Sequence, residues 1–252
     1  MLIAIVNNST LVNDVDVATM QNAINNQLWL HFLPAWRISN VRCQFYPKGQ
    51  VAPDWAWTIA IIDSNASVVT NPLGGKDTEF VIVDQILNNG GAVMVQDPTN
   101  PHQYTVSGTL SRKILKLILN RFDVTYCDDG YTSYALDACT PVEDVSYGIV
   151  INGVEVTVSD FVFESFFNSK ATVANAPFSY MNSVSTPFTL SVGGSVVIRI
   201  GGPGTETLLF GANVPQWRRD VEAAELGFDN QRKFARLAPA PAITMIDTVS
   251  VV

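Results

Sequence analysis

The sequence predicts an α/β protein, in which a mixed sheet carries two long helices over roughly residues 1–125 and a mostly β region is packed on it. Two patterns lead to this prediction. Apolar strand-like runs alternate with helix-period segments in the first half, and short β-like runs separated by turns follow from Tyr131 onward. With 252 residues, 47% of them hydrophobic and 15% charged, the chain is long enough and apolar enough to bury a full core.

The first predicted strand is the opening run MLIAIV. It lacks a basic leading segment and polar residues follow it at once, so we expect neither a signal peptide nor a membrane span. Asn13 or Asp14 is placed to cap a helix over about residues 15–32, whose apolar residues recur at steps of three and four. Pro34 is expected to end that helix.

The next segments predict the rest of the sheet. VRCQFYP (41–47) alternates like an edge strand, a loop with Gly49 and Pro53 follows, and WAWTIAIID (55–63) is apolar on both faces like a central strand. Residues 64–77 are expected to form a loop. FVIVDQIL (80–87) fits a strand or a helix, and GAVMVQD (91–97) fits a strand.

The second long helix is predicted to begin at Ser107 or Thr109 and to contain TLSRKILKLILN, with one apolar face. Beyond it, YALDA, YGIVI, VEVTVSDFVF and TLSVGGSVVIRI are β-like, and Asn152-Gly153 predicts a tight hairpin. A third helix is expected around residues 217–237. We therefore divide the chain into an α/β part (1–125), a mostly β part (126–237) and an extended C-terminal arm (238–252).

The charge balance bears on possible partners. The net charge of −8 gives no electrostatic reason to expect nucleic-acid binding. Cys43, Cys127 and Cys139 show no C-x-x-C spacing, so we expect reduced thiols. The low density of charge, with many Asn, Thr and Ser residues, favours a surface that packs against partners or copies of the chain.

Three blocks resemble a known family: SRKILKLILNR (111–121), DACTPVEDVSYGI (137–149) and NGVEVTVSDFVFESFF (152–167). They look like a largely uncharacterised zincin-like, metallopeptidase-like family of phage, prophage and bacterial proteins. That family's helix reads roughly S-H-E-x-L-E-x-L-x-D-P, and its later blocks read D-P-V-E-x-x-S-Y and V-S-D-F-V-x-P-x-F. The resemblance is strongest over residues 110–167 and faint in the first hundred, and it implies a zincin-like fold.

The chain departs from the family pattern where the chemistry would lie. Arg112 stands at the metal-binding His, Lys113 at the catalytic Glu and Lys116 at the next acidic position. Two fixed cations one helical turn apart would repel Zn²⁺, and no general base remains at position 113. We therefore expect no catalytic residue, no cofactor and no metal site, although an ordinary amphipathic helix unrelated to a zinc site is an alternative reading.

The chain has few candidate residues for other kinds of site. His31 and His102 are the only histidines and do not pair at ligand spacing. Five acidic residues could bind Ca²⁺ weakly, although they lack the spacing of an EF-hand; the alternative is that they are surface carboxylates or pair with Arg and Lys. These residues are Asp128, Asp129, Asp137, Glu143 and Asp144. No G-x-S-x-G motif is present, and the glycines of SVGGSVV are interpreted as turn residues.

Together these observations predict a non-catalytic virion structural protein, made in the host cytoplasm. A phage head or capsid-associated component, as a decoration or minor capsid protein, is the first choice; a neck, tail or baseplate protein, a divergent hydrolase and a host-interaction module are alternatives. The expected partners are other virion proteins, such as the major capsid protein, and copies of the chain itself, with no nucleic acid and no membrane.

We also expect Arg112 and Lys116 to pair with Asp137, Glu143 or Asp144. The arm is expected to dock on another subunit, with folding back onto its own sheet as the alternative.

Overall fold

The computed structural model describes residues 1–64, 74–120, 125–172, 174, 177–201, 204–224 and 226. The chain divides into two compact units, Met1–Val214 and Pro215–Val252. The larger unit contains α-helices, a parallel sheet and antiparallel sheets, in agreement with the predicted α/β class. The expected arm, residues 238–252, lies outside the described residues.

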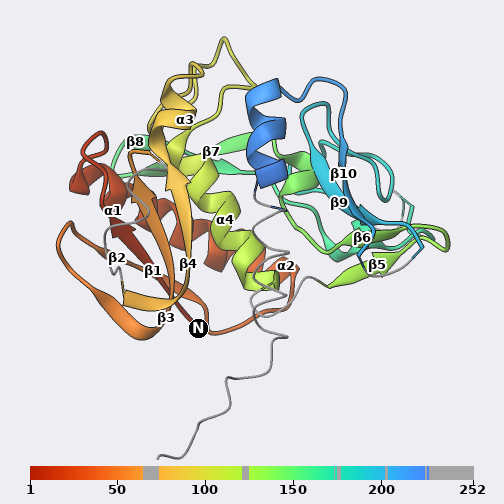
Figure 1. Cartoon of the computed structure of the whole chain (residues 1–252), viewed down its shortest axis with the longest axis horizontal. Helices are drawn as coiled ribbons and strands as arrows, with labels where there is room; N and C mark the ends of the chain where they lie inside the picture. Colours follow the sequence, from red (N-terminus) through yellow and green to blue (C-terminus); the bar gives the residue numbers. More distant parts are fainter. Residues whose placement is uncertain are drawn as a thin grey trace, which may run out of the picture. The chain divides into compact units, whose positions relative to one another are not determined.

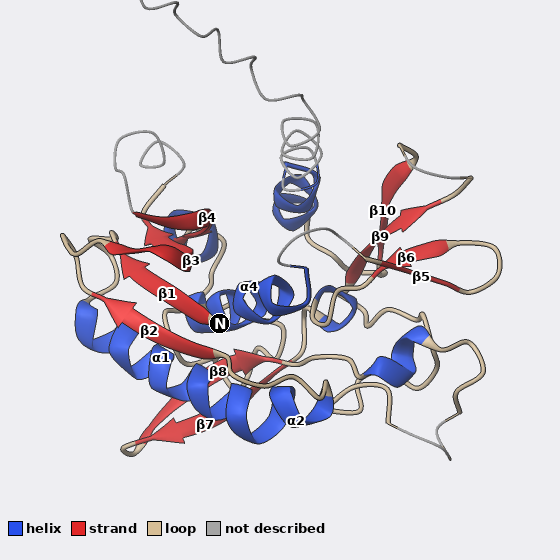
Figure 2. Cartoon of the chain, turned by 90° about the horizontal axis from the view of Figure 1, so that it is seen from below, coloured by secondary structure: helices blue, strands red, loops and turns tan. Residues whose placement is uncertain are grey.

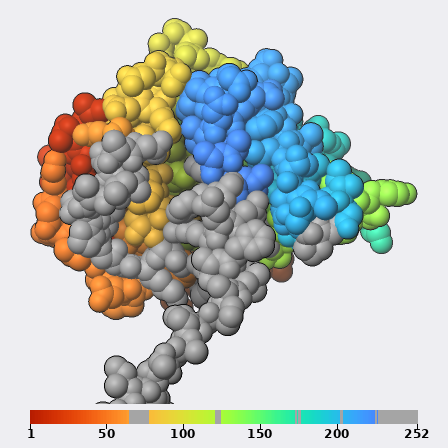
Figure 3. All heavy atoms as spheres, viewed as in Figure 1, coloured from red at the N-terminus to blue at the C-terminus, as the bar shows by residue number. Residues whose placement is uncertain are grey.

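The first sheet contains β1 (Leu2–Asn7), β2 (Arg42–Tyr46), β3 (Ala52–Ile62) and β4 (Gly74–Ile82) in the order β2-β1-β3-β4 (Figure 1). Its described pairings are all parallel, so the mixed sheet expected from the sequence is wrong. The reason is that connections such as the helix between β1 and β2 return the chain to the same end of the sheet before each new strand. Figure 3 shows the segments from β2 to α3, in orange and yellow, on one face.

Two strands begin earlier than expected. Pro53 belongs to β3 and residues 74–77 belong to β4, where loops were predicted. The register is irregular between the pairs Ala52↔Gly74 and Trp57↔Lys76. A bulge therefore separates the first pair of the two strands from the regular pairing that follows. Bulges of this kind accommodate a proline and glycines that would weaken a regular strand.

Helix α1 (Asp14–Gln27) is capped as the sequence predicts, because the Asn13 side chain accepts a hydrogen bond from the Asp16 N–H. It continues through a π-helical turn, η1 (Leu28–Phe32), into α2 (Leu33–Ala35). The helical run ends at Ala35, one residue after Pro34, so it extends slightly beyond the predicted end.

Helix α3 (Val83–Leu87) directly follows β4, so FVIVDQIL is strand in its first part and helix in its second. Helix α4 (Val106–Asn120) begins slightly earlier than predicted, since the Thr105 hydroxyl accepts the Gly108 N–H. The strand predicted at 91–97 is wrong. Only an isolated bridge from Ala92 to Thr105 forms there, and the Gln96 N–H donates to the Thr157 side chain instead of joining a regular ladder.

The later β segments form two further sheets. β5 (Tyr126–Asp128), β6 (Ser133–Ala135), β9 (Ser195–Arg199) and β10 (Glu206–Phe210) pair antiparallel in the order β10-β9-β6-β5. β7 (Ser146–Ile151) and β8 (Val154–Ser159) form the predicted hairpin. Asn152 and Gly153 both have positive φ, as a two-residue hairpin turn requires. Two short 3₁₀ helices, η3 (Thr140–Val142) and η4 (Glu164–Phe167), flank this hairpin in the sequence.

The main core lies between the parallel sheet, the two long helices and the β7–β8 hairpin. Ile3 and Ile5 of β1, Met20 of α1, Ile114 of α4 and Val156 of β8 belong to one buried cluster. Figures 1 and 2 show α1 and α4 between the parallel sheet and the hairpin. Helix α4 therefore runs through the middle of the larger unit, and most of its residues are buried.

The smaller unit contains a helix over residues 216–224, in the region where a third helix was predicted. Arg218 and Glu222, one turn apart on it, form a buried ion pair. In the described part of the chain, no helix has the length and apolarity needed to cross a membrane.

Candidate functional site

The three cations of α4 all lie beside carboxylates. Arg112 forms an ion pair with Glu143, and both side chains are at least 95% buried. Lys113 Nζ lies 3.8 Å from Glu79 Oε2 of β4, and Lys116 Nζ lies 3.9 Å from Asp137 Oδ2. The expectation that Arg112 and Lys116 pair with carboxylates of the next block is thus confirmed. The three cations lie on one side of α4, and their carboxylate partners come from two segments, β4 and the segment around η3.

The local sequence positions these carboxylates. Asp137 Oδ1 accepts the N–H groups of Cys139 and Thr140, at 2.9 and 3.1 Å, and this turn leads into η3. Pro141 lies in the first turn of η3, and Glu143 follows directly after it. Asp137 therefore has two roles, since one oxygen shapes the backbone before Glu143 and the other faces Lys116.

The paired glycines of SVGGSVV pack directly on this segment. A Cβ at Gly194 would overlap the carbonyl oxygen of Pro141, and a Cβ at Gly193 would overlap Asp144. Neither glycine has a positive φ. The interpretation of these glycines as turn residues alone is therefore incomplete, because they are also needed for a close approach of two backbones.

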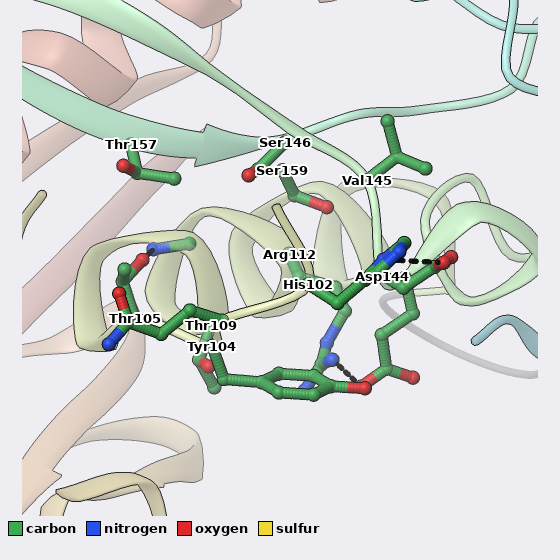
Figure 4. A pocket seen from close by; sticks show the side chains of 13 residues that line it. His102, Tyr104, Thr105, Thr109, Arg112, Asp144, Val145, Ser146, Thr157 and Ser159 are labelled. Atoms are coloured by element: carbon green, nitrogen blue, oxygen red, sulfur yellow. Dashed lines mark hydrogen bonds and ion pairs between the residues drawn. The ribbon is translucent and has the colours of Figure 1, made fainter. Parts of the chain in front are cut away.

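Asp144, next to Glu143, interacts with a different set of groups. His102 Nδ1 lies 3.3 Å from its Oδ2, and the Ser191 hydroxyl donates to its Oδ1. Figure 4 shows His102, Asp144 and Arg112 along one pocket. Its water-accessible volume is about 20 Å³, which is room for a single water molecule. The His102 side chain is 63% exposed at this pocket.

A network of uncharged polar side chains connects α4 and α1 to the β7–β8 hairpin. The Ser111 hydroxyl donates to Gln27 Oε1 at 2.6 Å, and Gln27 Nε2 donates to the Ser159 carbonyl at 2.7 Å and to the Tyr147 hydroxyl at 3.2 Å. His31 Nδ1 is 2.9 Å from the same hydroxyl. Burial lowers the pKa of His31, which favours the neutral ring. His31 of η1 and Gln27 of α1 therefore both connect this helical run to Tyr147 of β7.

Asp160 is a buried carboxylate that the sequence analysis did not single out. It is fully buried. Its Oδ1 accepts the N–H groups of Phe161 and Met181, and its Oδ2 accepts the Ser183 hydroxyl at 2.7 Å. Burial raises the pKa of Asp160 to about 6, although these hydrogen bonds act in the opposite direction. The signal in the sequence was an Asp inside the apolar run VSDFV.

A further polar cluster lies at the carboxyl ends of β1 and β3, a common place for sites in parallel sheets. Asp63 accepts hydrogen bonds from Ser9, Thr10 and Leu11. Burial raises the pKa of Asp63, but these hydrogen bonds outweigh it and the pKa lies below its usual range. The carboxylate closes the loop between β1 and α1, so its role is structural.

The candidate Ca²⁺ ligands do not form one site. Asp128 and Asp129 lie at the β5–β6 turn, where their side chains accept backbone N–H groups, at 2.6 Å from Gly130 and 2.8 Å from Tyr131. Asp137, Glu143 and Asp144 have the partners given above. Among the described residues, no group of three or more His, Cys, Asp or Glu side chains is arranged to hold a metal ion. Cys43, Cys127 and Cys139 are free thiols.

The arrangement around α4 has little that resembles a nucleophilic site. In a Ser-His-Asp triad the carboxylate orients the imidazole and the serine faces the other ring nitrogen. Here the Ser191 hydroxyl donates to Asp144 itself. Comparisons with protein-family models, with curated proteins and with solved structures found no match. The side-chain arrangement and the sequence resemblance are therefore the grounds on which a function is inferred.

Proposed function

We propose that this chain is a non-catalytic virion structural protein with a degenerate zincin-like fold, acting as a head or capsid-associated component of a phage. The observation that carries the proposal is the buried ion pair between Arg112 and Glu143. Arg112 stands where the family pattern has its metal-binding His, and Glu143 stands at the acidic position of the block P-V-E-x-x-S-Y.

The chemistry of this pair is opposed to metal binding. A zinc ligand must offer a lone pair, and a guanidinium has only N–H donors and a permanent positive charge. The Glu143 carboxylate is already neutralised by that charge. The guanidinium thus supplies the positive charge beside this carboxylate that a metal ion would bring, and it does so without a Lewis acid or an activated water.

The neighbouring positions support the same reading. A peptidase of this type needs a carboxylate as general base next to its metal ligand, and Lys113 occupies that position and faces Glu79. The pocket beside Arg112 has room for about one water molecule, whereas a peptidase must take up several residues of an extended chain. A protein in which ion pairs have replaced the reactive groups keeps the fold as a scaffold.

The virion role rests on the resemblance to a family of phage and prophage proteins and on the low density of charged residues, 15% of the chain. The proposed partners are the major capsid protein and copies of this chain, and the proposed location is the particle. A neck, tail or baseplate position differs only in the partner.

Mass spectrometry of purified particles tests the role. We expect the chain among the particle proteins, with an abundance relative to the major capsid protein that separates a decoration protein from a neck or tail component. Its absence from particles that contain all other structural proteins would contradict the virion role.

A separate measurement tests the absence of catalysis. After exhaustive dialysis, elemental analysis should find zinc far below one atom per chain, and the double variant Arg112→His/Lys113→Glu should remain inactive in a peptidase assay because further ligands are missing. Stoichiometric zinc or peptidase activity in the unmodified chain would favour the divergent hydrolase instead.

A further inference from the structure

Two outer strands of the larger unit differ in how their free edges are treated. At β2, the Cys43 N–H donates to Asn25 Oδ1 at 2.9 Å, and the Cys43 carbonyl accepts from Asn25 Nδ2 at 3.0 Å and from Gln21 Nε2 at 3.3 Å. Side chains of α1 therefore occupy the backbone N–H and carbonyl of Cys43 at this edge. Blocking an edge in this way prevents another strand from pairing with it.

The edge of β7 is different. β7 pairs with β8 alone among the described strands. The two-residue turn makes Ile151 and Val154 a hydrogen-bonded pair, so Ile149 and Tyr147 also point their backbone groups toward β8. Ser146, Gly148 and Val150 then direct their N–H and C=O groups outward. In the described part of the chain, no backbone hydrogen bond outside the hairpin uses these groups.

The side chains of β7 do not protect this edge either. The strand, SYGIVI, has no charged residue and no proline, which are the usual means of keeping an edge free. Val150 is 65% exposed. Figure 2 shows β7 on the outer side of the hairpin, away from the parallel sheet. Near the turn, an open groove of about 340 Å³ lies between the first half of α1 and Ile151, Asn152 and Val154.

The charge near the edge limits what can pair with it. The Glu155 side chain lies over Gly148, where a Cβ would overlap its carboxylate. If β7 paired with β7 of a second copy around Gly148, two Glu155 carboxylates would come together, and like charges directly opposite destabilise a sheet. An uncharged strand meets no such repulsion.

The chain itself contains a segment of that kind. Residues 243–252, ITMIDTVSVV, are rich in β-branched residues and carry one charge, Asp247. They lie outside the described residues. We propose that this segment of one copy adds as a strand to the free edge of β7 in a neighbouring copy, with the groove at the hairpin turn receiving its apolar side chains. This inference concerns self-association and is independent of the proposed role in a particle.

Donor and acceptor variants of the full chain test the proposal. Val150→Pro removes one outward N–H and places a ring at the edge, where proline is tolerated because the ladder to β8 does not use that N–H. Val150→Ala is its matched control, since it keeps the N–H. The donor is removed by deleting residues 243–252. Sedimentation velocity over a concentration series should show self-association of the unmodified chain, at least about tenfold weaker association for Val150→Pro and for the deletion, and a change below about threefold for Val150→Ala.

Mixing the two defective chains provides the decisive measurement. The Val150→Pro chain keeps its donor segment and the deleted chain keeps its acceptor edge, so together they should form a 1:1 complex although neither self-associates. Failure of the mixture to associate would overturn the proposal, as would a monomeric unmodified chain or an equal loss with Val150→Ala. Melting temperatures of the variants, compared with the unmodified chain, show whether the hairpin remains folded. Particle mass spectrometry of the unmodified protein is a separate result, so failure here leaves the proposed virion role standing.

Discussion

Glu143 and Asp160 are both buried carboxylates, and they lie in two neighbouring blocks of the chain, PVEDVSY and VSDFV. The structure compensates their burial in different ways. Glu143 faces the guanidinium of Arg112, whereas Asp160 accepts hydrogen bonds from two backbone N–H groups and a serine hydroxyl. A fixed cation holds a buried carboxylate in its charged form. Neutral donors alone leave the pKa of Asp160 raised to about 6.

Breaking the ion pair should give the largest effect. In Arg112→Met the side-chain volume is nearly kept and the positive charge is lost, while Glu143 stays buried. Removing one partner of a buried pair costs about 3–5 kcal/mol, and we expect a loss of this size in the free energy of unfolding, measured by urea denaturation at pH 7.

The double variant Arg112→Met/Glu143→Met sharpens this prediction. Replacing both partners by apolar side chains leaves neither member of the pair as an unpaired buried charge, so most of the lost stability should return. If the double variant is as unstable as Arg112→Met, the loss comes from packing of the arginine stem and the charge argument is wrong.

The close approach of Gly194 to the Pro141 carbonyl should give the second-largest loss of stability. In Gly194→Ala, the new Cβ overlaps the Pro141 carbonyl oxygen, and separating two backbones in a packed region costs up to about 3 kcal/mol. Gly148→Ala is a matched control, because its Cβ meets the flexible Glu155 side chain and we expect a change within about 0.5 kcal/mol. Thermal unfolding of the two variants side by side checks this, and equal losses would contradict it.

The raised pKa of Asp160 predicts that the free energy of unfolding depends on pH. The pKa of Asp160 is about 6 in the folded chain and its ordinary value is 3.8, so the folded state binds the proton more tightly. The contribution of Asp160 to stability is therefore fully present below about pH 4 and is lost as pH rises toward 6, by on the order of 2 kcal/mol.

Asp160→Asn tests that sign. The side chain no longer titrates, so the difference in unfolding free energy between the unmodified chain and the variant should shift by on the order of 2 kcal/mol in favour of the variant from pH 4 to pH 7. A difference that stays constant over this range would show that the pKa of Asp160 is not raised in the folded chain.

The sequence predicted the elements that depend on local patterns. The apolar run of β1, the Asn13 cap of α1 and the Asn152-Gly153 turn are confirmed. The strand at 91–97 was wrong. Its backbone groups bond to Tyr104, Val106, Ser107 and Thr157 through tertiary contacts that no local pattern contains. The π-helical turn before Pro34 was likewise not predicted by the local sequence pattern.

The candidate site was partly predictable for the same reason. Arg112 and Lys116 are one helical turn apart, and buried cations require carboxylates, so their pairing with Glu143 and Asp137 followed from the order of the blocks. The buried state of Asp160 and the contact of Gly194 with Pro141 did not follow. Both depend on residues 178–194 folding back onto the 141–160 region, which is a long-range contact.

The smallest expected effect concerns Lys116 and Asp137, a pair that is looser and more exposed than Arg112 and Glu143. The two charged atoms are 3.9 Å apart and the lysine side chain is 21% exposed, so we expect Lys116→Met to cost less than about 1 kcal/mol.

Asp137→Asn keeps an oxygen that accepts the Cys139 and Thr140 N–H groups and should cost a similar amount. Asp137→Ala also removes those two hydrogen bonds at the start of the turn before Glu143, so it should cost about 1–3 kcal/mol more. Denaturation of the three variants separates the two roles of Asp137. Equal costs for Asn and Ala would mean that the turn forms without the side chain, and that the position of Glu143 is set by Arg112 alone.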